Sequence, residues 1–321
     1  MSRPSRTGIF GRHDKRMKTK SEWIDAKLLR RFEAEGTDAH RLCTDDDGWV
    51  ERFGRDVLIS FKEPPVRERL TLELYFWRNS VGFDLGRVFA RFLPKKNEER
   101  EKPQLVFGDA NENLRTIAHE QFLKFGIDFS AGYSVGLFVD QRENRRYVRL
   151  SSPKRLLNCF AYTCSFSVAA ASVGAPTVNV DLSKKSLERG RGNFALNSLY
   201  TEDHRFIADD VLTVLPRLAH KGEKFDMIIL DPPTFSRSHR NKVFHVQKDF
   251  EDLLLNALEV AERNCRILLS TNCSGLRAKS LEVMARYCMK LTRRAAKFHR
   301  APALPDFPEG AAASAIWMVL R

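Results

Sequence analysis

The chain has 321 residues, 43% of them hydrophobic, and 54 basic against 41 acidic residues leave a net charge of +13. This size and apolar content allow one large domain or two smaller ones with real cores, and the positive surplus favours a polyanionic partner unless the basic side chains are spread over a mixed surface. The six cysteines form no CxxC pair and no zinc-ligand spacing with the histidines, and no signal-like apolar segment opens the chain, so we expect a cytoplasmic protein with reduced thiols and no metal.

The first quarter of the chain predicts a basic arm followed by helix and strands. Residues 1–20 carry seven Lys or Arg side chains and almost no apolar ones, so we expect them to be disordered. A helix is predicted over 21–35, with Ser21 as its cap and Gly36 as its stop. Strands are predicted at 49–53 and 57–61, joined by a hairpin-type turn.

From residue 154 onward, strand-like segments alternate regularly with helical ones, which indicates a parallel sheet covered by helices on both faces. We therefore predict an α/β protein with a small α+β domain over 21–128 and a Rossmann-like, doubly wound domain over 129–321. The charged segment 94–103, bounded by prolines, is predicted as a loop. The expected strands are 155–160, 177–181, 204–208, 225–230 and 266–270, and the clearest helices are 183–197 and 248–263.

One segment has the length of a membrane span. Residues 156–180 include no charged side chain over 25 positions, which is long enough to cross a bilayer. The segment also contains polar residues and is interrupted by Gly174 and Pro176, so it is better interpreted as strand, turn, short helix, turn and strand. We expect no membrane association.

The first strand of the second domain runs into a turn of small residues, and the next strand ends at Asp181. In a doubly wound sheet, ligands bind outside the C-terminal strand ends, where a strand-end carboxylate can accept both hydroxyls of a ribose. Nicotinamide-dependent dehydrogenases share this layout but need G-x-G-x-x-G to hold a pyrophosphate, and this turn has no glycine. The pattern therefore favours S-adenosylmethionine, which has no pyrophosphate, over a dinucleotide.

Two further aspartates follow strands of the same domain. Asp210 follows the third strand, where it can accept from the adenine amine or can equally cap the next helix. The fourth strand runs into Asp231-Pro232-Pro233-Thr234-Phe235. Because proline locks its own φ and restricts the residue before it, the Asp231 carboxylate is fixed in direction and can hold a base beside a methyl donor.

The fifth strand ends in a segment that contains Cys273. The fourth and fifth strands are expected to be neighbours, so Asp231 and Cys273 are predicted to face each other. A thiolate there can add to C6 of a pyrimidine, which makes C5 nucleophilic enough to take a methyl group. The alternative is a buried structural cysteine, which is common for free thiols.

At these motifs the sequence resembles the ribosomal-RNA large-subunit methyltransferases that modify cytosine at C5 or guanine. The resemblance covers about residues 40–321. It is carried by Gly-Leu-Phe-Val-Asp-Gln-Arg at 136–142, the Asn-x-Phe-x-Tyr-Thr turn at 158–163 and Val-Asp-Leu-Ser at 180–183. Asp-Pro-Pro-Thr-Phe-Ser at 231–236 resembles the guanine-N7 branch, whereas Cys-Ser-Gly-Leu at 273–276 resembles the cytosine-C5 branch, so the modified base stays open.

The resemblance implies a class I S-adenosylmethionine-dependent methyltransferase acting on RNA, with large-subunit ribosomal RNA as the expected substrate. Cytosine C5 is slightly favoured over guanine N7 or N2. A non-catalytic RNA-binding module is the third reading, because Cys164-Ser165 stands where many members have Gly-Gly. The basic arm and the basic run over 290–300 are candidate RNA contacts; the alternatives are a solvated tail, which is the default for the arm, and a solvated face for the run. The implied catalytic residues are Cys273 and Asp231, and the implied cofactor-binding residues are Gln141, Arg142, Asn158, Phe160, Tyr162, Thr163, Asp181, Leu182, Ser183, Asp210, Asp231 and Pro232.

Overall fold

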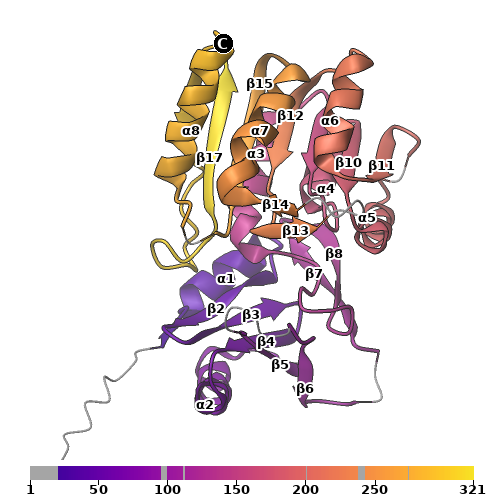
Figure 1. Ribbon diagram of the computed structural model, residues 1–321. Coiled ribbons are helices and arrows are strands. Elements are labelled where there is room, and N and C mark those ends of the chain that lie inside the picture. Colours follow the sequence, from indigo (N-terminus) through magenta and orange to yellow (C-terminus); the bar gives the residue numbers. More distant parts are fainter. Residues whose placement is uncertain (1–20, 95–99, 111–112, 200, 238–242, 274) are drawn as a thin grey trace, which may run out of the picture.

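The computed structural model describes residues 21–94, 100–110, 113–199, 201–237, 243–273 and 275–321. The chain forms an N-terminal sheet, drawn in indigo and purple, and a larger C-terminal sheet flanked by helices, drawn from magenta to yellow (Figure 1). The predicted basic arm, 1–20, lies outside the described residues, as do residues 95–99 of the predicted charged loop. None of the helices in the described ranges is both long and apolar enough to cross a bilayer.

The N-terminal sheet has six strands in the order in which they occur in the chain. Neighbouring strands are antiparallel except β4 and β5, which are parallel because helix α2 makes the crossover between them. Two prolines at the start of α2 suit positions where backbone N–H groups have no helical partner, and Gly82, with φ of 73°, ends the helix. The elements are β1 (Glu22–Trp23), α1 (Ala26–Ala34), β2 (Ala39–Asp45), β3 (Gly48–Phe53), β4 (Asp56–Phe61), α2 (Pro64–Val81), β5 (Val88–Phe92) and β6 (Gln104–Phe107).

The first helix starts later than the sequence predicts. Asp25, rather than Ser21, is its N-cap, and the Asp25 carboxylate accepts a hydrogen bond from the backbone N–H of Leu28 at 2.7 Å. The Ser21 hydroxyl donates instead to Asp45 on β2, at 3.0 Å. The predicted stop is confirmed, since Gly36 follows the helix with φ of 62°.

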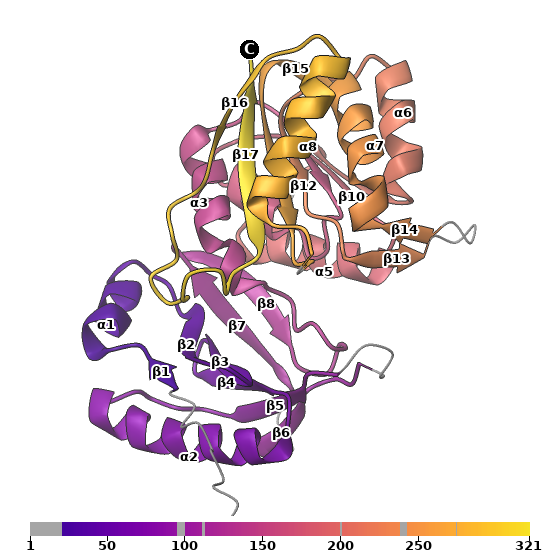
Figure 2. The same cartoon turned by 60° about the vertical axis from the view of Figure 1, so that its left-hand side comes forward.

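The C-terminal sheet has seven strands in the order β11-β10-β9-β12-β15-β17-β16. The first five strands are parallel to one another, β17 runs antiparallel to β15, and β16 runs antiparallel to β17. Helices α3, α4 and α5 pack on one face and α6, α7 and α8 on the other, which confirms the predicted Rossmann-like α/β class (Figure 2). The elements are η1 (Val139–Gln141), α3 (Arg142–Ser151), β9 (Leu156–Cys159), α4 (Ser165–Ala171), β10 (Thr177–Asp181), α5 (Lys184–Leu196), β11 (His204–Ala208), α6 (Val211–His220), β12 (Phe225–Leu230), β13 (Phe235–Arg237), β14 (Val243–His245), α7 (Val246–Glu259), β15 (Ala261–Thr271), α8 (Ala278–Leu291), β16 (Ala296–His299) and β17 (Ser314–Leu320).

Most predicted strands of this sheet agree with the structure, and β10, β11 and β12 have the predicted bounds. The predicted helix over 248–263 is wrong at its end, because the chain leaves α7 at Glu259 and residues 261–263 already belong to β15. The basic run over 290–300 is divided between the end of α8 and strand β16, so it does not form one face of a helix.

The hairpin of β7 (Arg115–Glu120) and β8 (Leu123–Asp128) lies between the two sheets (Figure 2). One buried apolar cluster joins Phe53 and Phe89 of the N-terminal sheet to Val168 and Leu187 of helices α4 and α5. The apolar core is therefore continuous across the junction, and the predicted domain boundary at residue 128 stays a prediction.

Two buried ion pairs lie at this junction, and both start from helix α3. The guanidinium of Arg142 binds Asp306 at 2.5 and 3.2 Å, and that of Arg145 binds Glu120 at 2.5 and 2.8 Å. The backbone N–H of Arg41 on β2 donates to the same Asp306 carboxylate at 2.9 Å. Asp306 therefore ties the loop before β17 to both α3 and the N-terminal sheet.

We expect Asp306→Ala to lower the free energy of unfolding by about 3–5 kcal/mol, because it leaves the Arg142 charge buried without a partner. Arg115→Ala is the control, because Arg115 is 67% exposed and pairs with Asp128 at the surface, where an ion pair contributes at most about 1 kcal/mol. Urea denaturation of both variants measures the difference. Equal losses in the two variants would contradict this role for Asp306.

Candidate active site

The C-terminal ends of four neighbouring parallel strands form one edge of the large sheet. In spatial order, β10 ends at Asp181, β9 runs into the turn at 160–164, β12 runs into Asp231, and β15 carries Ser270 near its end. Strands β13 and β14, which follow Asp231 in the chain, lie on the side of this sheet that faces the N-terminal part (Figure 1). Asp181, which is expected on the cofactor side of the edge, and Asp231, which is expected on the side of the target base (the base side), thus lie on either side of one turn.

Asp181 holds that turn through its carboxylate. One carboxylate oxygen accepts from the backbone N–H of Tyr162 at 2.8 Å, and the other accepts from that of Ser183 at 2.8 Å. Burial raises the pKa of Asp181, and the two backbone N–H groups partly oppose this rise. Each oxygen keeps a second lone pair, so the carboxylate can accept further hydrogen bonds from a diol such as a ribose.

The turn itself is tight although it contains no glycine. Phe160, Tyr162 and Cys164 all have positive φ, between 48° and 61°, a conformation that costs energy for residues other than glycine. Side-chain bonds hold it in place: the Thr163 hydroxyl donates to the carbonyl of Gly136 at 2.5 Å, and the Tyr162 hydroxyl donates to that of Ser134 at 2.9 Å. The predicted segment at 136–142 therefore begins directly against the turn.

Two other predicted cofactor residues are packed into the structure around this turn. The Asn158 amide, 1% exposed, donates to the Ser167 hydroxyl at 2.9 Å and so links β9 to α4. The ring of Phe160 packs against Phe244 of β14, with 5.6 Å between ring centroids. Both residues support the turn from inside the protein.

Cys164 stands where the resemblance implies a glycine in many members, and its side chain packs against Gly190 of α5. A Cβ added to Gly190 would lie only 2.5 Å from the Cys164 sulfur. The thiol is fully buried in the core between α4 and α5, where burial raises its pKa well above the ordinary value. Gly190 thus provides the space that the larger residue in the turn requires.

Asp231 is half-buried at the end of β12, directly before the buried Pro232. Burial raises its pKa to about 6, and the nearby charge of Asp140 adds to the rise. A hydrogen bond with the Ser270 hydroxyl and the positive charge of Arg145 act in the opposite direction. A carboxyl with a pKa raised by burial at a strand-end edge is a candidate for a chemical role.

The strand register places Ser270, rather than Cys273, beside Asp231. Leu230 pairs with Leu269 across β12 and β15, so the next residues of the two strands are Asp231 and Ser270. Cys273 lies three positions further on, half-buried against the main apolar core, and its backbone N–H bonds to the Thr271 hydroxyl at 3.1 Å. Sequence reasoning did not single out Ser270, because a serine at the end of an apolar strand carries no distinctive signal.

The loops after β12 and β15 are nevertheless joined. The Thr234 hydroxyl donates to the side-chain oxygen of Asn272 at 2.9 Å. The Asp-Pro-Pro-Thr loop and the segment leading to Cys273 therefore lie against each other at the base-side end of the edge.

The remaining predicted site residues cap helices or bind other groups in this structure. Asp210 caps α6 by accepting from the N–H of Leu212 at 3.0 Å, and Ser183 caps α5 by accepting from the N–H of Ser186 at 3.1 Å. Leu182 is half-buried between Asp181 and Ser183. The guanidinium of Arg142 is already engaged by Asp306, so the structure does not bring it to the strand-end edge.

Gln141, the last predicted cofactor residue, instead contacts the base-side end of the edge. Its amide donates to the Ser270 hydroxyl at 2.7 Å. Gln141 is therefore linked to Asp231 through Ser270.

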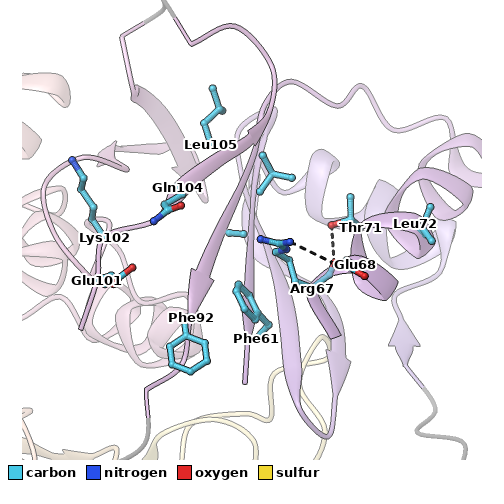
Figure 3. Close-up of a pocket in the computed structure, with 12 residues that line it drawn as sticks. Phe61, Arg67, Glu68, Thr71, Leu72, Phe92, Glu101, Lys102, Gln104 and Leu105 are labelled. Atoms are coloured by element: carbon cyan, nitrogen blue, oxygen red, sulfur yellow. Dashed lines mark hydrogen bonds and ion pairs between the residues drawn. The ribbon is translucent and has the colours of Figure 1, made fainter. Parts of the chain in front are cut away.

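A cavity of about 610 Å³ lies elsewhere, between α2 and strands β4, β5 and β6 (Figure 3). Phe61, Phe92, Arg67 and Lys102 are among its lining residues, and none of the predicted site residues in the described part of the chain lines it. It belongs to the face of the N-terminal sheet that packs against α2, so it is separate from the strand-end edge.

Comparisons with known proteins point to the same cofactor. The sequence profile of the S-adenosylmethionine-dependent methyltransferase family matches residues 96–319. The ribosomal RNA large subunit methyltransferase I of Tolumonas auensis is 34% identical over 218 residues, which are 67% of this chain and 54% of that protein. The protein of the same name from Escherichia coli O139:H28 is 31% identical over 293 residues, or 87% of this chain and 70% of that protein.

Among solved structures, one described as a methyltransferase complexed with SAH superposes with a TM-score of 0.78 at 24% identity, over 92% of this chain and 79% of that chain. At that identity the likeness concerns the fold. The fold and its strand-end edge thus define a Rossmann-like methyltransferase. More particularly, the chain belongs to the S-adenosylmethionine-dependent methyltransferase family that includes the ribosomal-RNA large-subunit methyltransferases. The predicted cofactor is confirmed, and the chain spans about half the length of the Tolumonas auensis relative.

The residues of the edge fit S-adenosylmethionine. Asp181 has lone pairs left for the ribose hydroxyls, and the turn at 160–164 is held against it by the Tyr162 N–H. S-adenosylmethionine has no pyrophosphate, so it does not need the glycines that hold one in dinucleotide-binding turns. The turn at 160–164 contains no glycine, in agreement with this cofactor.

We expect Asp181→Ala to weaken S-adenosylmethionine binding by about 1.5–3 kcal/mol, the range for losing hydrogen bonds to a charged group. Isothermal titration calorimetry measures the dissociation constant. Asp252→Ala, which removes an exposed carboxylate of α7, is the matched control and should bind normally. An unchanged constant in folded Asp181→Ala would remove Asp181 from the cofactor site.

The raised pKa of Asp231 predicts a pH-dependent effect on stability. The folded protein binds this proton more tightly than the unfolded chain, whose ordinary value is 3.8, so the contribution of Asp231 to stability is present at low pH and is lost as the pH rises through about 6. The asparagine side chain of Asp231→Asn stays neutral at every pH. The free energy of unfolding of this variant should therefore rise by about 2–3 kcal/mol relative to that of the wild type as the pH goes from 4 to 7. Urea denaturation across this range tests it, and a pH-independent difference would contradict the raised pKa.

Proposed function

We propose that the protein transfers a methyl group from S-adenosylmethionine to a base of large-subunit ribosomal RNA, in the cytoplasm. The observation that carries the proposal is Asp231, a half-buried carboxylate placed by Pro232 and Ser270 one strand away from the turn that Asp181 holds. The names of the relatives support the RNA substrate, since both are ribosomal RNA large subunit methyltransferase I. The net charge of +13 supports a polyanionic partner.

The proposed division of labour follows the order of the strands. Asp181 would hold the cofactor by its ribose, and the backbone of the turn at 160–164 would line the same site. When bound, the cofactor supplies an electrophilic methyl group. Asp231 would accept a hydrogen bond from the amine of the target base and so fix the direction of the base. These roles require an ionised Asp231, which is the dominant form above its pKa of about 6.

Within this function we propose cytosine C5 as the acceptor atom, with Cys273 as the nucleophile. Unactivated C5 is a poor nucleophile, but addition of the Cys273 thiolate to C6 turns the C5–C6 unit into an enamine-like system. After C5 has gained the methyl group, a base such as a water molecule takes the original C5 proton. The electron pair of that C–H bond re-forms the C5–C6 double bond as the C6–S bond breaks and releases the thiolate. The position of Cys273, on a loop bonded to the Asp-Pro-Pro-Thr loop through Thr234 and Asn272, supports this proposal.

A guanine nitrogen is the second candidate. It needs no thiol, because a ring or exocyclic nitrogen already carries a lone pair. The packing of Cys273 against the main apolar core favours this alternative, since it suits a structural cysteine. In that case Asp231 alone would orient the base. A non-catalytic RNA-binding protein is the third possibility, and absence of S-adenosylmethionine binding in calorimetry would favour it.

The cytosine proposal predicts that Cys273→Ala abolishes methyl transfer to ribosomal RNA while cofactor affinity stays nearly unchanged. The wild type should also form a covalent complex with RNA that contains 5-fluorocytosine, because fluorine replaces the C5 proton and cannot leave as a cation, so the C6–S bond is not broken. Cys288→Ala, which removes a buried thiol of α8, is the matched control and should keep activity. Mass spectrometry of the RNA locates the methyl group, and full activity of Cys273→Ala would move the assignment to guanine.

A further inference from the structure

Four side chains form a hydrogen-bond chain that ends at Asp231. The indole N–H of Trp317 on β17 donates to the side-chain oxygen of Asn144 on α3, at 3.0 Å. The Asn144 amide donates to the oxygen of Gln141 at 2.7 Å, and the Gln141 amide donates to the Ser270 hydroxyl at 2.7 Å. The register of β12 and β15 places the Ser270 hydroxyl beside Asp231, where hydrogen bonding from Ser270 lowers the pKa of the Asp231 carboxyl.

The two ends of this chain set its direction. An indole N–H can only donate, so Asn144 must turn its oxygen toward Trp317 and its amide toward Gln141. Gln141 must then accept with its oxygen and donate with its amide, which occupies a lone pair of the Ser270 hydroxyl. The single proton of Ser270 is therefore directed to the remaining partner, the Asp231 carboxylate.

All four members of the chain are buried. The exposed fractions are 0% for Trp317, 6% for Asn144, 3% for Gln141 and 0% for Ser270. Water cannot readily replace any of these bonds, and bonds in series within a low-dielectric interior polarise one another. Because both amides use a donor and an acceptor, reversing either one would set two oxygens or two N–H groups against each other.

We propose that Trp317, Asn144, Gln141 and Ser270 act as a directional relay that holds Asp231 as a hydrogen-bond acceptor. The inference rests on the proposed role of Asp231 toward the target base. It assigns Gln141 to the base side of the edge as a positioning residue, and it adds Ser270, Asn144 and Trp317, for which no role was predicted from the sequence.

Two charged groups also face Asp231. Asp140 of η1 favours protonation of the carboxyl, whereas Arg145 of α3 opposes it. The Ser270 hydroxyl adds a neutral hydrogen-bond donor, which favours the ionised form of Asp231. Loss of that donor would move protonation of Asp231 toward higher pH, and the protonated carboxyl would offer a proton to the base instead of accepting one.

The experiment measures protonation of Asp231 without substrate or cofactor. The stability of the full chain is followed by urea denaturation against pH, with and without Asp231→Asn in the same background. The midpoint of the difference reports the pKa of Asp231 in that background. The backgrounds are wild type, Ser270→Ala, Ser270→Thr, Trp317→Phe and Tyr147→Phe.

We expect the midpoint to rise by about one pH unit in Ser270→Ala, the scale of one hydrogen bond to a charged group. It should rise by a smaller amount in Trp317→Phe, which keeps an aromatic ring but frees both amides to reverse. Ser270→Thr keeps the hydroxyl and should restore the wild-type midpoint. Tyr147→Phe is the matched control, because the Tyr147 ring packs on Trp317 at 4.5 Å without joining the chain of bonds.

An unchanged midpoint in Ser270→Ala would overturn the proposal. So would a shift in Ser270→Ala with none in Trp317→Phe, because Ser270 would then act without the relay. If Ser270→Ala does not fold, Ser270→Cys replaces it, since a thiol donates weakly. Methyl transfer by the wild type is assayed separately, so shifted midpoints without any methyl transfer would leave the relay standing and refute the proposed function.

Discussion

The burial of two arginine side chains on α3 is the constraint on which the arrangement of this protein depends. Arg142 and Arg145 lie inside the molecule, and a buried guanidinium is tolerated only where a carboxylate meets it with good geometry. Asp306 comes from the loop before β17 and Glu120 from the β7–β8 hairpin. These two ion pairs therefore tie helix α3 to the hairpin and to the C-terminal loop, and Asp306 extends the link to β2 of the N-terminal sheet.

That docking position has consequences for the site. Gln141 directly precedes α3, so fixing the helix also fixes the amide that meets Ser270. On the other side of the edge, the backbone of the turn after β9 is held by Asp181 and by hydroxyl bonds to the segment at 134–136. The cofactor side and the base side are thus supported by different parts of the chain, which meet along the segment from 134 to 142.

The turn shows how this chain tolerates a departure from the glycine-containing pattern that it resembles. The backbone at Cys164 has the left-handed conformation that favours glycine, and the cysteine side chain also needs space in the core. Gly190 provides that space on the facing helix, so the larger residue points into the core between α4 and α5. Cys164 in the turn therefore packs directly against a glycine of the neighbouring helix.

The sequence by itself determined the alternation of strands and helices, the carboxylates at the ends of β10 and β12, and a turn unsuited to a pyrophosphate, because each depends on local pattern and on residues a few positions apart. It placed the cap of α1 and the end of α7 wrongly, since several residues there could serve and neighbouring contacts select one. Only the tertiary structure decided that Arg142 binds Asp306, that Ser270 lies beside Asp231, and that Trp317 and Asn144 are connected to them. These partners are separated by up to 173 positions along the chain, and hydrogen bonds between buried groups at such separations depend on how strands and helices pack, which no local pattern encodes.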